Sequence, residues 1–351
     1  MNYYLSQPIF AHGKYHSHFF DQSFVFTCED FYTQPFTNQL GYDHIRQAAW
    51  QQIVDCVKEQ FEKHQCKRIY IDLTGQCWSS DAKYAQIAYE SFSSFAPTKI
   101  ISHDYRDFYH ANTQVIWFPT WTYAFLVPDY ARNVKNISSS TKNLPAMCFN
   151  RNATWHRMVF FSLLCKKNIL SKINYSFSYS LQKNKDNPFA YCLMTSQEIA
   201  DFEHYKNLLP IVIDKKFHVY DITLESNFYD QCAVNIVTDT DLDVTAFGGK
   251  AIKPFIAKQI PVLIAGVGSN QFLTDLGFDM FPDLVPWHDW DLNNDSRQRV
   301  YAVADFLENF LQQDIVKLHS QLHDRVENNR KLLYSPEFKN KITQQIALEG
   351  Q

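Results

Sequence analysis

The chain has 351 residues, which is enough for two domains with cores of their own. Its formal net charge is −4, so it has no overall attraction to nucleic acid or to an anionic membrane, although a local basic face would be compatible with that charge. We expect no transmembrane helix, because no long apolar run is free of charges, and we expect no leader at the start. The eight cysteines lack C-x-x-C spacing, which favours reduced thiols in the cytoplasm and no zinc site.

The first part of the chain predicts an α/β domain over residues 1–125. Apolar periodicity predicts helices at 44–63 and 81–92. Short apolar runs predict strands at 68–73, 99–102 and 114–118. Polar side chains close the first two strands, and histidines are interleaved in the aromatic segment 7–36; the candidates for acid–base chemistry are therefore Asp72, His103, Asp104, His12, His16 and His18. Each of them is also compatible with a purely structural role.

A polar stretch with two prolines marks the expected connection between domains. We place a linker at 126–145, a second α/β domain at 146–333 and a polar tail at 334–351. The second domain opens with a strand at 146–149, a polar loop and an apolar helix at 155–165. The loop and helix start carry Arg151, His156 and Arg157, an anion-binding candidate at the end of a strand. The alternative is an arginine that pairs with an acid at a domain interface.

The stretch 234–283 carries the strongest pattern. A strand ends at Asp239, and Gly248 and Gly249 then open a helix that bears Lys250 and Lys253 one turn apart. A helix N-terminus with an ammonium group beside it favours anions.

A second strand at 261–265 leads to Gly266, Gly268 and Ser269, at an edge where open α/β sheets bind ligands. The two loops together predict a cradle for a phosphate or diphosphate. The alternative is a pair of glycine-containing turns with two solvated lysines.

The remaining pattern predicts a short strand at 278–281, a loop at 286–291, a helix at 296–310 and a final helix at 314–333. A basic strip formed by Lys135, Lys142, Lys166, Lys167 and Lys172 is a mild argument for nucleic acid as a partner.

Several ordered motifs over residues 146–333 resemble bacterial and viral sugar transferases of the GT-B architecture, related to the α-1,3-fucosyltransferase-like group. They are N-R-x-x-x-x-H-R at 150–157, G-G-K-A-I-K-P at 248–254, P-V-L-I-A-G at 261–266, L-T-D-L-G-F at 273–278, F-P-D at 281–283 and E-N-N-R at 327–330. The resemblance implies two Rossmann-like domains that face a central cleft, with the acceptor on the first domain and a nucleotide sugar on the second. It does not extend to the first 125 residues.

The resemblance also implies metal-independent glycosyl transfer without a cofactor, in which lysine and arginine neutralise the leaving phosphate. The group's glutamate before the lysine is Gly249 here, which leaves the donor's identity open. Asp239, Asp241 or Asp243 would take over its contact with the donor, or would bind a metal in a competing interpretation.

The acceptor is a glycan, or a modified base in DNA if the chain comes from a phage. A non-catalytic module that binds a nucleotide or phosphosugar is the alternative function. A dinucleotide-binding reading is weaker, because G-x-G-x-x-G is missing.

Overall fold

The computed structural model describes residues 23–27, 51, 54–55, 57–59, 61–63, 65–72, 79–102, 114–117, 142–150, 153–177, 188–211, 224, 227–239, 242 and 249–349. The chain divides into two compact units, which are described separately. Unit 1 comprises residues 1–120 and 340–351, and unit 2 comprises residues 121–339. Each unit contains a parallel sheet with helices, so the expected α/β class with two Rossmann-like units is confirmed.

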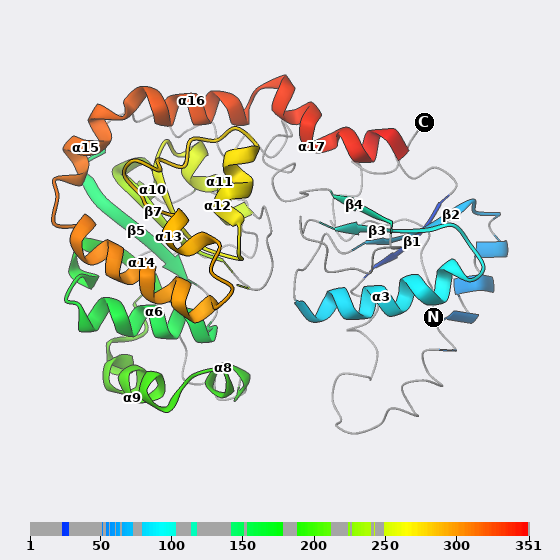
Figure 1. The fold of residues 1–351 in the computed structure, drawn as a ribbon, viewed down its shortest axis with the longest axis horizontal. Helices are drawn as coiled ribbons and strands as arrows, with labels where there is room; N and C mark the ends of the chain where they lie inside the picture. Colours follow the sequence, from blue (N-terminus) through cyan, green and yellow to red (C-terminus); the bar gives the residue numbers. More distant parts are fainter. Residues whose placement is uncertain are drawn as a thin grey trace. The chain divides into compact units, whose positions relative to one another are not determined.

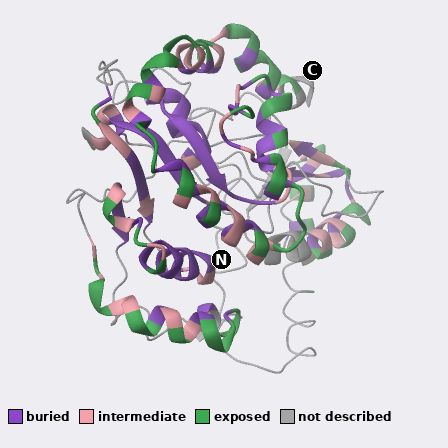
Figure 2. Cartoon of the chain, turned by 60° about the vertical axis from the view of Figure 1, so that its left-hand side comes forward, coloured by how far each residue is buried: buried purple, intermediate pink, exposed green. Residues whose placement is uncertain are grey.

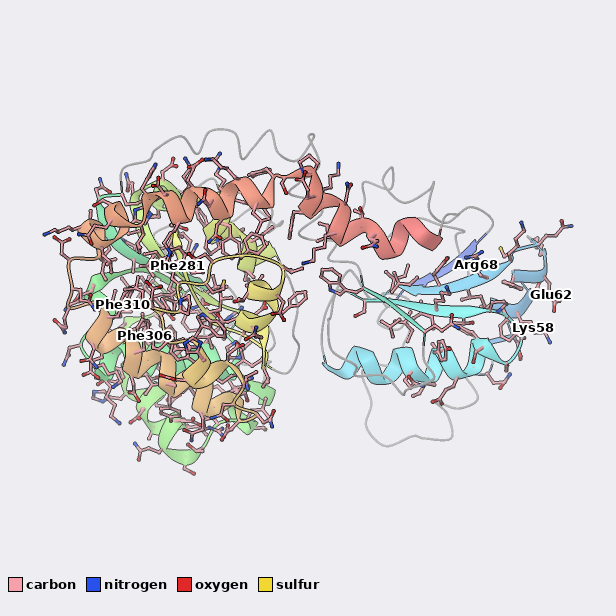
Figure 3. The ribbon with its side chains drawn as sticks, turned by 45° about the horizontal axis from the view of Figure 1, so that its top comes forward. Lys58, Glu62, Arg68, Phe281, Phe306 and Phe310 are labelled. Carbon is pink, nitrogen blue, oxygen red and sulfur yellow. The ribbon has the colours of Figure 1, made fainter. Side chains whose placement is uncertain are left out.

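Unit 1 is built on a four-stranded parallel sheet in the order β1-β2-β3-β4. Its elements are β1 (Ser23–Thr27), β2 (Arg68–Asp72), α3 (Ser79–Ser93), β3 (Thr98–Ser102) and β4 (Val115–Trp117). The apolar residues Ile69, Ile71 and Ile100 pack with Phe92 of α3 and with Val57 of the helical residues at 51–63. On that helical segment Lys58 and Glu62 are labelled in Figure 3, together with Arg68 at the start of β2.

Unit 2 is built on a second parallel sheet, in the order β6-β5-β7-β8. The strands are β5 (Leu144–Asn150), β6 (Ile173–Phe177), β7 (Cys232–Thr238) and β8 (Ile260–Ile264). Every residue of β7 and β8 is buried, as is typical of parallel strands covered on both faces. Figure 2 shows these strands as buried, with exposed residues on the surrounding helices.

Helices surround this sheet. The described helices of unit 2 are α6 (Trp155–Lys166), α8 (Pro188–Cys192), α9 (Ser196–Tyr205), α10 (Asn227–Gln231), α11 (Gly249–Ile256), α12 (Ser269–Asp275), α13 (His288–Asp291), α14 (Ser296–Phe310), α15 (Ile315–Gln321) and α16 (His323–Leu333). The last helix, α17 (Pro336–Glu349), begins in unit 2 and ends in unit 1. In Figure 1, α6 and α14 lie on one side of the sheet and α11 and α16 on the other. Single 3₁₀ turns follow at Leu170–Lys172 and Lys206–Leu208. No helix of the described residues is long and apolar enough to cross a bilayer.

Aromatic stacking fixes α14 on its neighbours. Phe306 and Phe310, labelled in Figure 3, stack with their ring centroids 4.8 Å apart. Trp290 of α13 packs against Phe306 at 5.6 Å. The loop predicted at 286–291 therefore contains the short helix α13, whose buried tryptophan gives that turn an apolar face.

Two further expectations are corrected. The strand expected at 278–281 is absent, because the Asn329 side chain binds both the N–H and the C=O of Asp279, each at 2.8 Å, in place of a neighbouring strand. The final helix expected at 314–333 is two helices that meet at Leu322. The residues expected as a tail contain α17, in which Phe338 and Ile342 are buried one helical turn apart.

Phe278 joins α11 to α17 within unit 2. Its ring stacks on Phe255 at 4.2 Å and meets Phe338 edge-on at 5.2 Å. We expect Phe278→Ala to lower the free energy of unfolding by about 3–5 kcal/mol, because it leaves a cavity among buried rings. Urea unfolding of the variant measures this loss. Phe278→Leu, which keeps most of the volume, should lose clearly less, and equal losses would contradict the stacking account.

Candidate functional site

The sheet of unit 2 has one place where a ligand crevice is expected. The chain leaves β5 for β6 on one side and later returns to β7 on the other side of β5. The loops after β5 and β7 therefore diverge, and open α/β sheets bind their ligands at such a switch point, beyond the carboxyl ends of the strands. Here those ends are Asn150 of β5 and Thr238, with Asp239 directly after it.

Arg157 of α6 ties the two strand ends together. Its Nη2 donates to the main-chain carbonyls of Thr238 and Asp239, both at 3.0 Å, and its Nε donates to Thr238 Oγ1 at 3.3 Å. The side chain is only 1% exposed. These donors are directed to oxygen atoms of Thr238 and Asp239, so the guanidinium binds the carboxyl end of β7 and adds a positive charge to the switch point.

His156 reaches the same carbonyl. Its Nε2 lies 2.9 Å from Asp239 O and 3.1 Å from Thr154 Oγ1. Because a carbonyl oxygen only accepts, Nε2 carries the proton and Nδ1 is the unprotonated nitrogen. Burial lowers the pKa of His156 well below its usual value, and the charges of Arg157, Lys250 and Arg299 lower it further. The imidazole is therefore neutral at neutral pH.

Polar side chains link the carboxyl ends of β5 and β7 to the middle of β6. Thr238 Oγ1 donates to Asn150 Oδ1, and Asn150 Nδ2 donates to the hydroxyl of Tyr175 on β6 at 3.2 Å. All three residues are buried. Burial raises the pKa of the Tyr175 hydroxyl well above its usual value, so it takes part as a neutral group. The network fixes the relative position of β5, β6 and β7.

The two lysines of α11 have different surroundings. Lys250, in the first turn, is half-buried; its charge helps to lower the pKa of His156 and partly offsets the burial that raises the pKa of Cys148 of β5. Lys250 therefore lies close to the switch point. Lys253 is buried, with its ammonium 5.8 Å from the ring centroid of Tyr229 on α10. The sequence predicts that both lysines contact one anion. Of the two, Lys250 is the main candidate for that contact.

The loop after β8 differs from the expected cradle. The N–H of Gly268, at φ 75°, donates to Asp291 O at 2.8 Å, and the N–H of Ser269 donates to Gly266 O at 3.1 Å. The Asp291 carboxylate accepts from the N–H groups of Asn270 and Gln271, both at 3.0 Å. A buried carboxylate from this chain therefore occupies the N-terminus of α12, and the N–H groups of Gly268, Ser269, Asn270 and Gln271 are already used within the chain. The Ser269 hydroxyl of this loop is buried and has no hydrogen-bond partner in the structure, so it is a polar group that a ligand could bind.

Arg299 was not predicted as a site residue. From α14 it donates to three main-chain carbonyls, those of Ala265 at 3.2 Å, Leu242 at 2.6 Å and Asn293. Only 1% of the residue is exposed. It holds the loop after β8 and lies near enough to His156 to lower its pKa. The only signal in the sequence is a charged residue directly beside the apolar face of a predicted helix.

Asp72 is the last residue of β2 in unit 1 and pairs in register with Thr27 and Ile101. The remaining candidates lie outside the described residues; they are Arg151, Gly248, His12, His16, His18, His103, Asp104, Asp241 and Asp243. Their roles stay predictions.

The expected basic strip is not a free surface where the structure describes it. Lys142 is buried and donates to three carbonyls, at 2.7–3.0 Å. Lys166 pairs with Asp201, and Lys167 pairs with Asp305 and Glu308. Lys172 donates to Gln312 at 2.7 Å. Lys135 lies outside the described residues. The described lysines of this strip thus have partners within the chain, and nucleic acid as a partner stays a prediction.

The motifs at 278–283 and 327–330 meet in the structure. Asn329 binds the main chain of Asp279, and Arg325 binds the carboxylates of Asp279 at 2.5 Å and Asp283 at 2.8 Å. The Arg325 guanidinium also lies 4.7 Å from the ring of Phe281, which adopts a left-handed φ of 53°. These motifs therefore shape the packing of α16 on the loop after α12.

Comparison with known proteins gives a distant structural match. No family model matches the sequence, and no curated protein matches it. The structure is similar to a solved structure described as "Crystal structure of Anabaena Alr3699/HepE in complex with UDP and glucose". The sequence identity is 14% and the TM-score is 0.44, over 84% of this chain and 74% of that chain. At this distance the match is too weak to indicate a ligand or an activity for this chain.

The buried neutral His156 predicts a specific pH dependence. Its folded pKa lies below the unfolded value of about 6.5, so the unfolded chain takes up the proton first as the pH falls, and stability is lost below about pH 6.5. In His156→Gln, which keeps a donor for Asp239 O, the melting temperature should fall less between about pH 7.5 and 5.5 than in the wild type. The exposed His204 gives the control His204→Gln, and a wild-type pH profile in His156→Gln would contradict the assignment.

Proposed function

We propose that the chain is a glycosyltransferase that moves a sugar from a nucleotide-sugar donor to an acceptor hydroxyl. The observation that carries the proposal is the set of cations at the switch point of unit 2, where Arg157, Lys250 and Arg299 all act on one neutral, buried histidine. Cations held at the carboxyl ends of parallel strands suit a phosphate or diphosphate. The ordered motifs of residues 146–333 support the same proposal.

Lys250 is the group that we assign to the leaving phosphate. It stands at the start of α11, where the helix dipole adds to its charge, and it is half-buried rather than buried. Negative charge grows on the leaving phosphate as the bond to the sugar breaks. A cation already in place stabilises that charge without reorganisation of solvent.

In this proposal Arg157 and His156 are positioning residues that do not contact the reacting atoms. Their side chains bind the carbonyls of Thr238 and Asp239, which fixes the carboxyl end of β7 next to the proposed donor. The Ser269 hydroxyl is the free polar group on the β8 side. Donor contacts by Arg151, Gly248 and Lys253 are part of the proposal and rest on the sequence pattern.

The acceptor side is assigned to unit 1. Transfer with inversion needs a base that removes the proton of the acceptor hydroxyl. Asp72, at the carboxyl end of β2, is the described candidate, and His16, His103 and Asp104 are the others. A glycan is the acceptor that we favour over DNA, because the described lysines of the expected basic strip are engaged within the chain. The proposed location is the cytoplasm, where free thiols such as Cys148 persist.

Lys250→Ala should lower turnover by roughly 10²-fold, the loss typical of removing one group that stabilises transition-state charge. The melting temperature should stay close to that of the wild type, since the side chain is only half-buried. Acceptor-dependent release of the nucleotide from a panel of nucleotide sugars measures turnover. Lys331→Ala, at an exposed lysine of α16, is the matched control.

Unchanged turnover in Lys250→Ala would remove this lysine from the site. Binding of nucleotide sugars without release in the presence of any acceptor would favour the alternative, a non-catalytic module.

Metal independence gives a separate prediction. If lysine and helix dipole carry the charge of the leaving phosphate, EDTA should leave turnover unchanged. Loss of turnover with EDTA and its return with manganese would transfer the role to the aspartates around Asp239 and would overturn the assignment of Lys250.

A further inference from the structure

A cavity lies in unit 2, away from the switch point. It has a volume of about 470 Å³ and is lined chiefly by Lys142, Asp314, Lys317, His319, Ser320 and His323. Five of these come from α15 with its N-cap and from the start of α16, and Lys142 precedes β5. The volume falls in the range of small-molecule sites, about 300–1,000 Å³.

The cavity and the switch point lie at opposite ends of the sheet. Lys142 stands two residues before Leu144, where β5 begins, whereas Asn150 at the switch point ends the same strand. A strand of seven residues spans about 23 Å, at roughly 3.3 Å per residue. A ligand in this cavity therefore binds apart from the proposed nucleotide-sugar donor.

Lys142 gives the cavity a fixed positive charge. Its ammonium donates to the carbonyls of Tyr229 at 2.9 Å, Asp230 at 3.0 Å and Ala257 at 2.7 Å, which uses all three N–H groups. Burial lowers the pKa of Lys142 to about 8, with opposing effects from Asp230 and Cys232, so the group is still mainly charged at neutral pH. Lys258 and Arg330 add positive charge nearby, the first of them paired with Glu327 at 2.5 Å.

The groups that a ligand can reach belong to α15 and α16. Lys317 and His323 are exposed and line the cavity with Ser320, whose hydroxyl donates to Lys317 O at 2.6 Å and keeps its lone pairs free. His319 Nε2 lies 2.7 Å from Lys258 O, so it carries the proton. Burial lowers the pKa of His319, and the charges of Lys142 and His323 lower it further.

Among the residues that line the cavity, Asp314 is the one carboxylate, and it already accepts a hydrogen bond within the chain. Asp314 caps α15 and accepts from the N–H of Lys317 at 3.0 Å. The N–H groups of Lys142 and the Nε2–H of His319 are used within the chain, so among the lining residues Lys317 and His323 are left as donors, and Lys142 adds only its charge. Donors beside a fixed positive charge suit a phosphate group, which carries more than one negative charge and several acceptor oxygens.

We propose that this cavity binds the phosphate group of a small phosphorylated molecule, of the size of a sugar phosphate. Free phosphate fills only a small part of about 470 Å³, so the remaining volume accommodates the organic part of such an ester. Lys317 and His323 contact the phosphate, and the buried Lys142 contributes its positive charge. The proposal does not depend on the glycosyltransferase assignment, because it uses none of the residues at the switch point.

The test is calorimetric titration of the full chain with glucose 1-phosphate, with inorganic phosphate and glucose as separate probes. We expect glucose 1-phosphate to bind, inorganic phosphate to bind more weakly, and glucose alone not to bind. The Lys317→Ala/His323→Ala double variant should weaken the binding of glucose 1-phosphate at least about tenfold, the scale of one lost charge-assisted hydrogen bond. Both positions are exposed, so the variant should fold, and a near-native melting temperature verifies that.

Two further variants locate the binding. Lys166→Ala removes an exposed lysine from another part of unit 2 and should leave the affinity unchanged. Lys250→Ala, which disables the proposed donor site, should also leave it unchanged. No binding of glucose 1-phosphate to the wild type, equal binding to the double variant, or loss of binding in Lys250→Ala would each overturn the proposal.

Discussion

The pair of hydrogen bonds that Asp239 O accepts is the constraint on which the candidate site depends. Arg157 and His156 are neighbours in sequence at the start of α6, and both donate to this one carbonyl after β7. They join the start of α6, the helix that follows β5, to the carboxyl end of β7 at the switch point of the sheet.

That link has an electrostatic consequence. Arg157 and Arg299 are almost fully buried, and their donors reach main-chain carbonyls of the loops after β7 and β8. Burying charged groups costs free energy unless they are hydrogen-bonded, and these bonds offset the cost while the positive charge remains. Burial and these nearby charges lower the pKa of His156, so its imidazole is neutral at neutral pH. The structure thereby builds a rigid electropositive edge with Lys250 as its more accessible member, which suits the binding of a phosphate.

The sequence predicted the strands and helices of this edge well, because their signals are local. The apolar runs at 234–238 and 261–265 became β7 and β8, and the helix expected at 155–165 became α6. The capping of α12 by Asp291 was not predictable in this way, since the carboxylate lies 20 residues or more along the chain from the amides that it binds. The Asn329–Asp279 pair is a similar case, with 50 residues between the partners. The separation of Lys250 from Lys253 depends on the Tyr229 ring, which helical spacing alone does not reveal.

The central claim is that the switch point of unit 2 binds a nucleoside diphosphate through Lys250. The most direct measurement is the change in melting temperature with UDP, GDP, dTDP and ADP, in the wild type and in Lys250→Ala, because a ligand that binds only the folded state stabilises it by mass action. The account predicts that one of these nucleotides raises the melting temperature of the wild type and that the rise is lost in Lys250→Ala. An equal rise in both proteins, or no rise with any nucleotide, would contradict it.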